Sequence, residues 1–356
     1  MQKSDALEHS IEQDLVIADL RDALRKSQRA LVLAKDKQAA VTQAAFEGAR
    51  DAMLGMDRPK VPKPRLRHNN GTGKPEHALW HLTDWQGAKK TTTYNTEVMR
   101  QRVHQFVDTA ESITAIHRSD HPVNDCTIML GGDMIEGLFN FPTQPYEVDA
   151  TLFDQFVNVA TLLDEVARRA ASIYDNVTII GEAGNHGRLG SKRDAVPRSD
   201  NADRMTYRLA AAMTKDEPRI TWQDSPEDIQ RVEIGNYRAL LIHGDEFGRG
   251  GFASPMTIVR HCDRWRSGAY AWDFRDVYVG HYHNHAEWAM ANGEGSVYQT
   301  GSTESDNRYA RDSMSASAIP SQRLHFVEPV KGRVTAQYKI TLANKASLGV
   351  EKVTGG

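Results

Sequence analysis

Apolar positions recur every three or four residues in several parts of the chain, which predicts amphipathic helices. Between residues 96 and 116, for example, Met99, Val103, Phe106 and Ala110 share one helical face. The same period predicts further helices after this one. We predict helices at Thr96–Ile116, Leu152–Ala171, Ala202–Met213 and Pro255–Trp265.

Short apolar runs bounded by turn residues predict strands. These runs are Ala78–Thr83, Cys126–Leu130, Val177–Ile180, Ile229–Glu233, Tyr237–Ile242, Asp276–Val279, Ala286–Met290, Ser296–Thr300, Leu324–Val327 and Thr335–Ile340. Strands and helices alternate in the first half, and the second half is mostly strands. This mixture predicts an α/β protein whose helices cover a sheet or a pair of sheets. Residues 78–340 are expected to form this domain.

The two ends of the chain have a different character. Residues 1–57 predict a helical extension, which either packs on the main domain or forms a coiled coil for self-association. Residues 58–77 hold four prolines and six Lys or Arg residues before Glu76, a composition that predicts a basic linker. Such a linker is either simply solvated or contacts a nucleic-acid backbone. Residues 341–356 are expected to be a poorly ordered tail.

Composition excludes several classes of protein. The net charge of −3 argues against a histone-like protein whose affinity rests on global charge. Cys126 and Cys262 make no disulfide framework, and a reducing compartment suits them. No apolar run approaches the roughly 18 residues that a membrane span needs, and the polar N-terminus is not a secretory signal. We therefore expect a cytoplasmic protein without a membrane partner.

Five polar clusters follow predicted strands, where ligands of open α/β sheets gather. The clusters are Thr83–Gln86, Gly131–Glu136, Gly184–Arg188, Ile242–Asp245 and Gly280–His283. They offer carboxylate, amide and imidazole groups, which suit divalent metals such as Mn²⁺, Fe²⁺, Zn²⁺ or Co²⁺. Each cluster alone is also compatible with an ordinary turn. Five in this order, all at strand ends, are not explained by turn chemistry.

This order of clusters resembles the calcineurin-like metallophosphoesterase superfamily, whose motifs run D-x-H, G-D, G-N-H, a lone H and G-H-x-H. The resemblance covers roughly residues 78–327. It implies a four-layer αββα sandwich of two mixed sheets with a two-metal phosphoesterase site at one rim. The closest likeness is to phage or bacterial DNA-repair exonuclease-like members.

The resemblance also implies roles for individual residues. A first metal ion would be held by Asp84, Gln86, Asp133 and His283, and a second by Asp133, Asn185, His243 and His281. The expected ions are two divalent metals, above all Mn²⁺, with Fe²⁺, Zn²⁺, Mg²⁺ or Co²⁺ as alternatives. His186 would be the catalytic histidine near the leaving group, with Glu136 as its carboxylate partner. Arg188 is a candidate phosphate contact.

Two positions depart from the family pattern. Gln86 replaces the histidine of D-x-H, and an amide oxygen is a weaker ligand than imidazole, so the first metal is expected to bind weakly. Gly137 stands where protein phosphatases of the superfamily carry an arginine, which disfavours a protein serine/threonine phosphatase.

The leading hypothesis is a metal-dependent phosphodiesterase acting on nucleic acid, with a hydroxide activated by two metals. Trp85 and other aromatic residues in the clusters are candidates for base stacking. One alternative is a phosphodiesterase or phosphomonoesterase for small nucleotides. Another is a catalytically weakened binding or assembly module, for which Gln86 is the reason.

Overall fold

The protein is described from a computed structural model of residues 1–356. The described residues are 60–64, 72–140, 143–190, 200–248, 253–291, 293–305 and 319–342, with isolated positions between 26 and 55. Contacts divide the chain into Met1–Met56 and Asp57–Gly356, and every strand named here belongs to the second unit. Most of the expected helical extension, half of the basic linker and nearly all of the tail lie outside the described residues.

One sheet has six strands in the order β11-β10-β1-β2-β3-β4. They are β1 (Glu76–Leu82), β2 (Val123–Leu130), β3 (Asn176–Gly181), β4 (Ile220–Gln223), β10 (Ser321–Glu328) and β11 (Arg333–Thr341). β1 to β4 run parallel, whereas β10 and β11 are added antiparallel beside β1. The sheet is therefore mixed, and the carboxyl ends of its parallel strands share one edge.

The other sheet has five strands in the order β5-β6-β7-β9-β8. They are β5 (Gln230–Ile234), β6 (Tyr237–Ile242), β7 (Asp276–Val279), β8 (Ala286–Ala289) and β9 (Ser296–Gln299). β6, β7 and β9 are parallel, and β5 and β8 close the two sides antiparallel. β5 and β6 form the hairpin that the Gly235-Asn236 turn favours.

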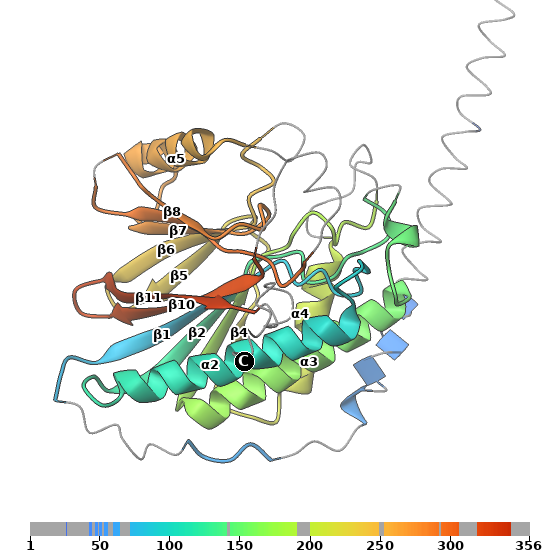
Figure 1. Ribbon diagram of the computed structural model, residues 1–356, viewed down its shortest axis with the longest axis horizontal. Coiled ribbons are helices and arrows are strands. Elements are labelled where there is room, and N and C mark those ends of the chain that lie inside the picture. The colour runs from blue at the N-terminus through green and yellow to red at the C-terminus, as the bar shows by residue number, and fades with distance from the viewer. Residues whose placement is uncertain are drawn as a thin grey trace, which may run out of the picture. The chain divides into compact units, whose positions relative to one another are not determined.

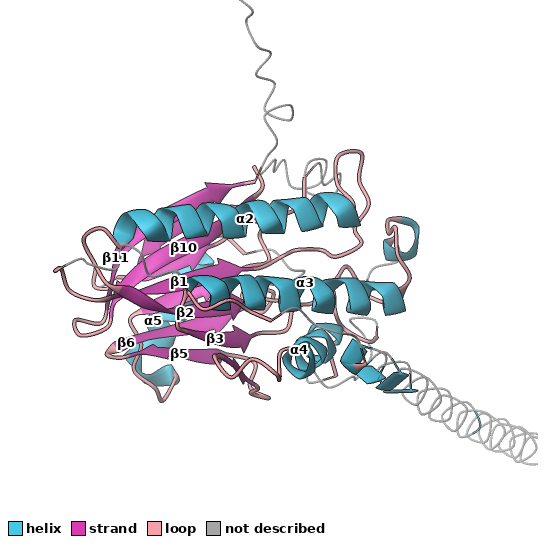
Figure 2. Cartoon of the chain, turned by 90° about the horizontal axis from the view of Figure 1, so that it is seen from below, coloured by secondary structure: helices cyan, strands magenta, loops and turns pink. Residues whose placement is uncertain are grey.

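Helices cover the outer faces of both sheets (Figure 1). α2 (Thr96–His117), α3 (Leu152–Ile173) and α4 (Ala202–Met213) lie against the six-stranded sheet, as Figure 2 shows, and α5 (Pro255–Arg264) lies on the five-stranded one. Each helix begins after an Asn, Thr or Ser whose side chain accepts a backbone N–H of the first turn. The result is a helix–sheet–sheet–helix sandwich, which confirms the expected fold class.

Apolar side chains fill the spaces between the layers. Leu79, Met129 and Ile180 of the six-stranded sheet pack against Leu241 and Tyr278 of the five-stranded one. On the opposite face of β1, Trp80 meets Phe106 of α2 edge to face, with ring centroids 5.4 Å apart. Because the central strands are apolar on both faces, the polar chemistry of this domain is concentrated where those strands end.

The strand β4 was not predicted. Its four residues alternate between half-buried and exposed positions, and it pairs only with β3 at the sheet edge. An edge strand this short carries little of the apolar signal on which strand prediction depends. All ten predicted strands and all four predicted helices are present, and their observed ends differ from the predicted ones by up to three residues.

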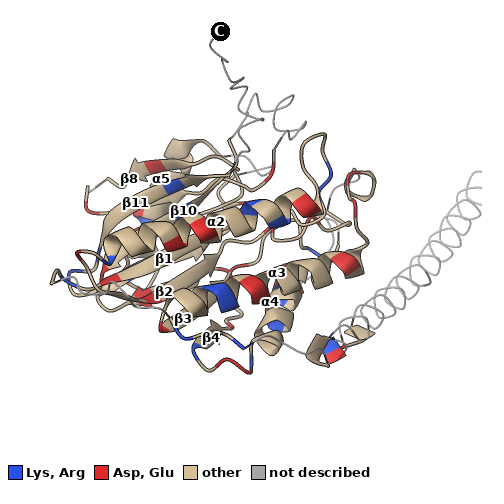
Figure 3. Ribbon diagram, turned by 60° about the horizontal axis from the view of Figure 1, so that its bottom comes forward, with Lys and Arg blue, Asp and Glu red and all other residues tan. Residues whose placement is uncertain are grey.

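Charged residues of both signs are interspersed on α2 and α3 (Figure 3). Arg100 pairs with Glu165 at 2.7 Å, and Arg169 pairs with Asp108 at 2.9 Å. This helical face therefore offers no continuous basic track to a nucleic acid. Among the described residues, no helix is both long enough and apolar enough to cross a bilayer.

Candidate metal centre

The five polar clusters meet at one edge of the sandwich. Three follow the parallel strands β1, β2 and β3, and two follow β6 and β7 of the facing sheet. The backbone N–H of His281, after β7, donates to the Asp84 carboxylate, after β1, at 2.9 Å. This contact joins the loops of the two sheets, so residues some 200 positions apart form one site.

The backbone of the predicted ligands is unusual. Six described residues other than glycine have a positive φ, and five of them are candidate ligands. These are Asp84 (53°), Gln86 (49°), Asp133 (51°), His281 (64°) and His283 (57°). Side chains with a Cβ adopt this left-handed region rarely and at a cost, and such residues cluster at functional sites.

Asp133 lies at the centre of the site. Its Oδ2 is 3.1 Å from Nε2 of His243 and 3.4 Å from Nε2 of Gln86. Although burial opposes ionisation, the neighbouring histidines, above all His243, hold the pKa of Asp133 below its usual value. One carboxylate is thus shared between the two groups of side chains that, by the family resemblance, would hold two metals.

The first group joins Asp84 and His283. Nε2 of His283 lies 3.3 Å from Oδ1 of Asp84 and 3.5 Å from Nε2 of Gln86. Nδ1 of His283 faces the buried carboxylate of Glu304 at 3.2 Å. Burial lowers the pKa of His283, but the bonds to Asp84 and Glu304 outweigh it and raise that pKa to about 10. Glu304 therefore fixes the ring with Nε2 directed into the site.

The second group joins Asn185, His243 and His281. Ligand atoms of Asp133, His243 and His281 lie within 4.8 Å of one another, a spacing that a single metal ion can bridge. Oδ1 of Asn185 is 3.2 Å from Nε2 of His243, whose Nδ1 is held by the Gly131 carbonyl at 2.7 Å. This donor set suits borderline divalent cations.

Gln86 fits the site as an oxygen ligand. Its side chain is buried, and its Oε1 has no hydrogen-bond partner among the described residues. A buried amide oxygen without a partner is costly, and a cation would satisfy it. Because the amide can turn about its last bond, the oxygen can take the place now held by Nε2, beside Asp133 and His283.

Glycine is required where the loops approach each other. A Cβ added at Gly184 would lie 2.1 Å from Oδ1 of Asp133, and one at Gly280 would lie 2.7 Å from Oδ2 of Asp84. Real Cβ atoms do not come so close to other atoms. The absent side chains therefore leave the space that the two carboxylates occupy.

His186 stands beside the two ligand groups with partners of its own. Its Nδ1 is 3.2 Å from Oε2 of Glu136, and its Nε2 is 3.9 Å from Oδ2 of Asp133. Burial lowers the pKa of His186, but the carboxylates of Glu136 and Asp133 outweigh it and raise that pKa to about 9. Glu136 also accepts from Lys89 Nζ at 3.0 Å. The arrangement holds a proton on His186 in the pH range of most cells.

Arg188 contacts an acidic residue of the next cluster. Its Nη2 donates to Oδ2 of Asp245, which follows His243 by two residues. This pair joins the loop after β3 to the loop after β6. Arg188 therefore lies at the rim with one side of its guanidinium engaged by Asp245.

Sequence reasoning missed the residue that clamps the loops, Asp203. Its buried carboxylate accepts the backbone N–H groups of Asp133 (2.8 Å), Met134 (3.1 Å), Ile135 (3.3 Å) and Gly184 (2.9 Å). In the sequence Asp203 is an ordinary acidic residue in the first turn of a predicted helix. Glu304 was missed as well, because no motif surrounds it.

One expectation about aromatic residues is wrong. Trp85 was a candidate for base stacking, but its side chain is completely buried. Tyr94, whose hydroxyl hydrogen-bonds to the Trp85 carbonyl, packs in the same buried region. Trp85 therefore packs in the interior beneath the loop after β1, where it cannot stack on a base.

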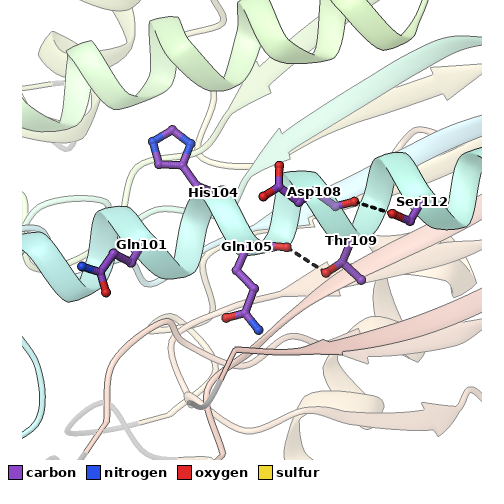
Figure 4. A pocket seen from close by; sticks show the side chains of 6 residues that line it. All are labelled: Gln101, His104, Gln105, Asp108, Thr109 and Ser112. Carbon is purple, nitrogen blue, oxygen red and sulfur yellow. Dashed lines mark hydrogen bonds between the residues drawn. The ribbon is translucent and has the colours of Figure 1, made fainter. Parts of the chain in front are cut away.

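A shallow hollow on α2 is separate from the candidate metal centre. Six polar side chains of that one helix line it: Gln101, His104, Gln105, Asp108, Thr109 and Ser112 (Figure 4). Thr109 and Ser112 donate to carbonyls of their own helix. None of the candidate ligands lines this hollow.

No family model and no curated protein matches this chain. Among solved structures, Vps29 from Entamoeba histolytica, described as complexed with zinc, is 10% identical, with a TM-score of 0.34 over 75% of this chain and 99% of that one. A predicted phosphoesterase from Streptococcus pneumoniae is 10% identical, with a TM-score of 0.29 over 75% of this chain and 98% of that one. A putative 5'-nucleotidase from Staphylococcus aureus is 11% identical, with a TM-score of 0.35 over 78% and 56%. At TM-scores this low the superpositions add nothing to the fold described above, a sandwich of two mixed sheets between helices.

Proposed function

We propose that this protein is a metal-dependent phosphodiesterase whose substrate is a nucleic acid. The observation that carries the proposal is the position of Asp133, between Gln86 on one side and His243 on the other, with His186 next to it. A carboxylate shared by two groups of oxygen and nitrogen ligands, with a proton-bearing histidine alongside, suits the hydrolysis of phosphate esters.

The candidate ligands divide the work of holding cations. Asp84, Gln86, Asp133 and His283 would hold one ion, and Asp133 with Asn185, His243 and His281 would hold the other. Divalent cations bound there would supply Lewis-acid chemistry, by polarising phosphoryl oxygens and activating water.

His186 supplies the proton. Glu136 faces its Nδ1, so that ring orientation is fixed and Nε2 is directed toward Asp133. The N–H at Nε2 would donate to the leaving oxygen as the ester bond breaks. Lys89 is bound by both Glu136 and Glu147, so it balances the charge of the carboxylate behind His186.

Two features of the sequence support a nucleic acid as the substrate. The basic segment 58–77 supports a polyanionic substrate, since six Lys and Arg residues precede its first acidic residue. Gly137, at the position after Glu136, supports a substrate other than a phosphoprotein, as the resemblance implies.

The test is the hydrolysis of bis-p-nitrophenyl phosphate and p-nitrophenyl phosphate with Mn²⁺. We expect the diester to be cleaved faster than the monoester. His186→Ala should lower diester cleavage about 100-fold or more, which is the usual contribution of a general acid. Asp133→Ala should abolish it. The matched control is His104→Ala, which removes a histidine on the outer side of α2.

Failure to cleave either ester with Mn²⁺, Fe²⁺, Zn²⁺, Mg²⁺ or Co²⁺ would contradict the proposal. Gln86 favours one other function in that case. Because its amide replaces an imidazole ligand, the site would then be that of a binding or assembly module with weakened catalysis.

A further inference from the structure

In the part of the chain that the structure describes, the exposed aromatic residues lie on one segment. Among the described residues only three Phe, Tyr or Trp side chains are classed as exposed: Phe139 (39%), Tyr146 (88%) and Phe153 (44%). All three fall in the aromatic loop, by which we mean residues 137–140 and 143–153, between the cluster after β2 and the first turn of α3. The other exposed large apolar side chains are aliphatic or Met and are scattered along the chain. A fully projecting tyrosine serves no packing purpose.

The aromatic loop is fixed to the candidate metal centre. Nε2 of Gln144 donates to the Glu136 carbonyl at 2.6 Å and lies 3.2 Å from Nδ1 of His186. At the other end, Oε1 of Gln155 accepts the backbone N–H of Gly137 at 2.8 Å. Both ends of the loop are thus held beside the histidine that would protonate the leaving group. A ligand bound to the aromatic loop would therefore lie next to the candidate metal centre.

A lysine lies next to the aromatic loop in space. The backbone N–H of Lys90 donates to the carbonyl of Glu147, the neighbour of Tyr146, at 2.8 Å. The Lys90 side chain is exposed and has no ion-pair partner among the described residues. The ammonium of Lys89, in contrast, is bound to Glu136 and Glu147. Lys90 is therefore an exposed cation next to the aromatic loop that is available to a phosphate.

We propose that the aromatic loop binds unpaired bases of a nucleic-acid strand whose scissile phosphate lies at the metal centre. The inference rests on the proposed function and narrows its substrate to single-stranded nucleic acid or a frayed end. Aromatic rings stack on bases of any sequence, and a nearby cation contacts the backbone. Bases in a closed duplex are already stacked on each other, so they cannot use such rings.

The test measures binding in EDTA, where hydrolysis plays no part. The full-length protein is titrated into a fluorescein-labelled oligothymidylate, and the fluorescence anisotropy is followed. Tyr146→Ala should weaken binding about tenfold, the usual loss of one base–aromatic stack. Tyr146→Phe keeps the ring and should bind like the wild type, whereas Tyr146→Leu keeps only an apolar side chain and should bind like the alanine variant.

Ile116→Ala is the matched control, because it removes an exposed apolar side chain (68% exposed) outside the loop. The triple replacement of Phe139, Tyr146 and Phe153 by alanine should abolish preference for the single strand over a blunt duplex of the same length. The proposal would be overturned if Tyr146→Ala bound the oligothymidylate as tightly as the wild type. It would also be overturned if Tyr146→Leu kept the wild-type affinity. Either result would leave the loop as a surface for a protein partner. A failure of the proposed function is distinguishable, since it appears as absent ester cleavage by the wild type.

Discussion

At the scale of single residues, the site is built from backbone conformations that ordinary side chains avoid. A left-handed residue with a Cβ costs about 1–3 kcal/mol, and Asp84, Gln86, Asp133, His281 and His283 all adopt this conformation. Such strain persists only where surrounding structure determines it. The strand ends and their hydrogen bonds do so here, and they direct these side chains toward a common point.

Gln86 is the candidate metal ligand at which this chain departs from the pattern of the family that it resembles. Replacing it by histidine should strengthen Mn²⁺ binding about tenfold, about 1.4 kcal/mol, because imidazole is the better ligand. Isothermal titration calorimetry measures the change. Gln101→His, on the exposed side of α2, is the control. An unchanged affinity would mean that the side chain at position 86 does not reach the metal.

Gly184 is expected to tolerate no side chain. Gly184→Ala would place a methyl group 2.1 Å from Oδ1 of Asp133, so the two loops must separate. Overpacking of this kind costs about 1–3 kcal/mol, and metal binding should be lost while the fold is retained. Circular dichroism and metal titration separate these effects. Gly48→Ala, where the added methyl group meets nothing within 4 Å, should change neither.

At the scale of elements, the first turn of α4 organises the site. Asn201 caps this helix and donates to the Gly184 carbonyl at 2.7 Å, while Asp203 accepts from the loops after β2 and β3. One helix end thus holds two ligand loops at a fixed separation. The strands place the loops at one edge, and α4 sets their register.

Asp203→Asn tests this role. The amide would present an N–H group to backbone N–H donors, so at least one hydrogen bond is lost, at a cost of about 1–3 kcal/mol. We expect Mn²⁺ affinity to fall about 10- to 100-fold, as for other groups that position metal ligands. Glu97→Gln, an exposed first-turn carboxylate of α2, should leave it unchanged. The electron paramagnetic resonance signal of bound Mn²⁺ would show whether the ligand geometry has changed. If Asp203→Asn lowers stability alone, the residue has no positioning role.

At the scale of the whole domain, Glu76 of β1 joins two elements that are far apart in the sequence, α2 and β11. Its carboxylate lies 2.6 Å from Nδ1 of His117 in α2 and accepts from Thr335 of β11, also at 2.6 Å. Burial raises the pKa of Glu76, but the bonds to His117 and Thr335 outweigh it and lower that pKa below its usual value. The ionised form therefore stabilises the contact of β1 with the helix layer and with the strand β11.

We expect the protonation of Glu76 to lower the stability of the fold in acid. A carboxylate whose pKa is lowered by folding contributes fully above the pKa of the unfolded chain, 4.5 for Glu76, and loses that contribution as the pH falls below it. Glu76→Gln should cost about 1–3 kcal/mol of unfolding free energy at neutral pH and flatten the acid dependence. Urea unfolding at a series of pH values measures both. Glu233→Gln, at an exposed position of β5, should keep the wild-type profile; the same slope in both variants would contradict the assignment.

The sequence by itself determined the elements and the residue types of the site. Long apolar periods and short, mostly apolar runs specify their structure locally, and ligand clusters directly follow strands such as β1 and β2. Only the tertiary structure decided how the clusters meet. Asp203, Glu304 and the burial of Trp85 depend on contacts between residues far apart in the chain, and no local pattern encodes such contacts. The exposure of Tyr146 belongs to the same class, because a side chain is exposed only with respect to all the others.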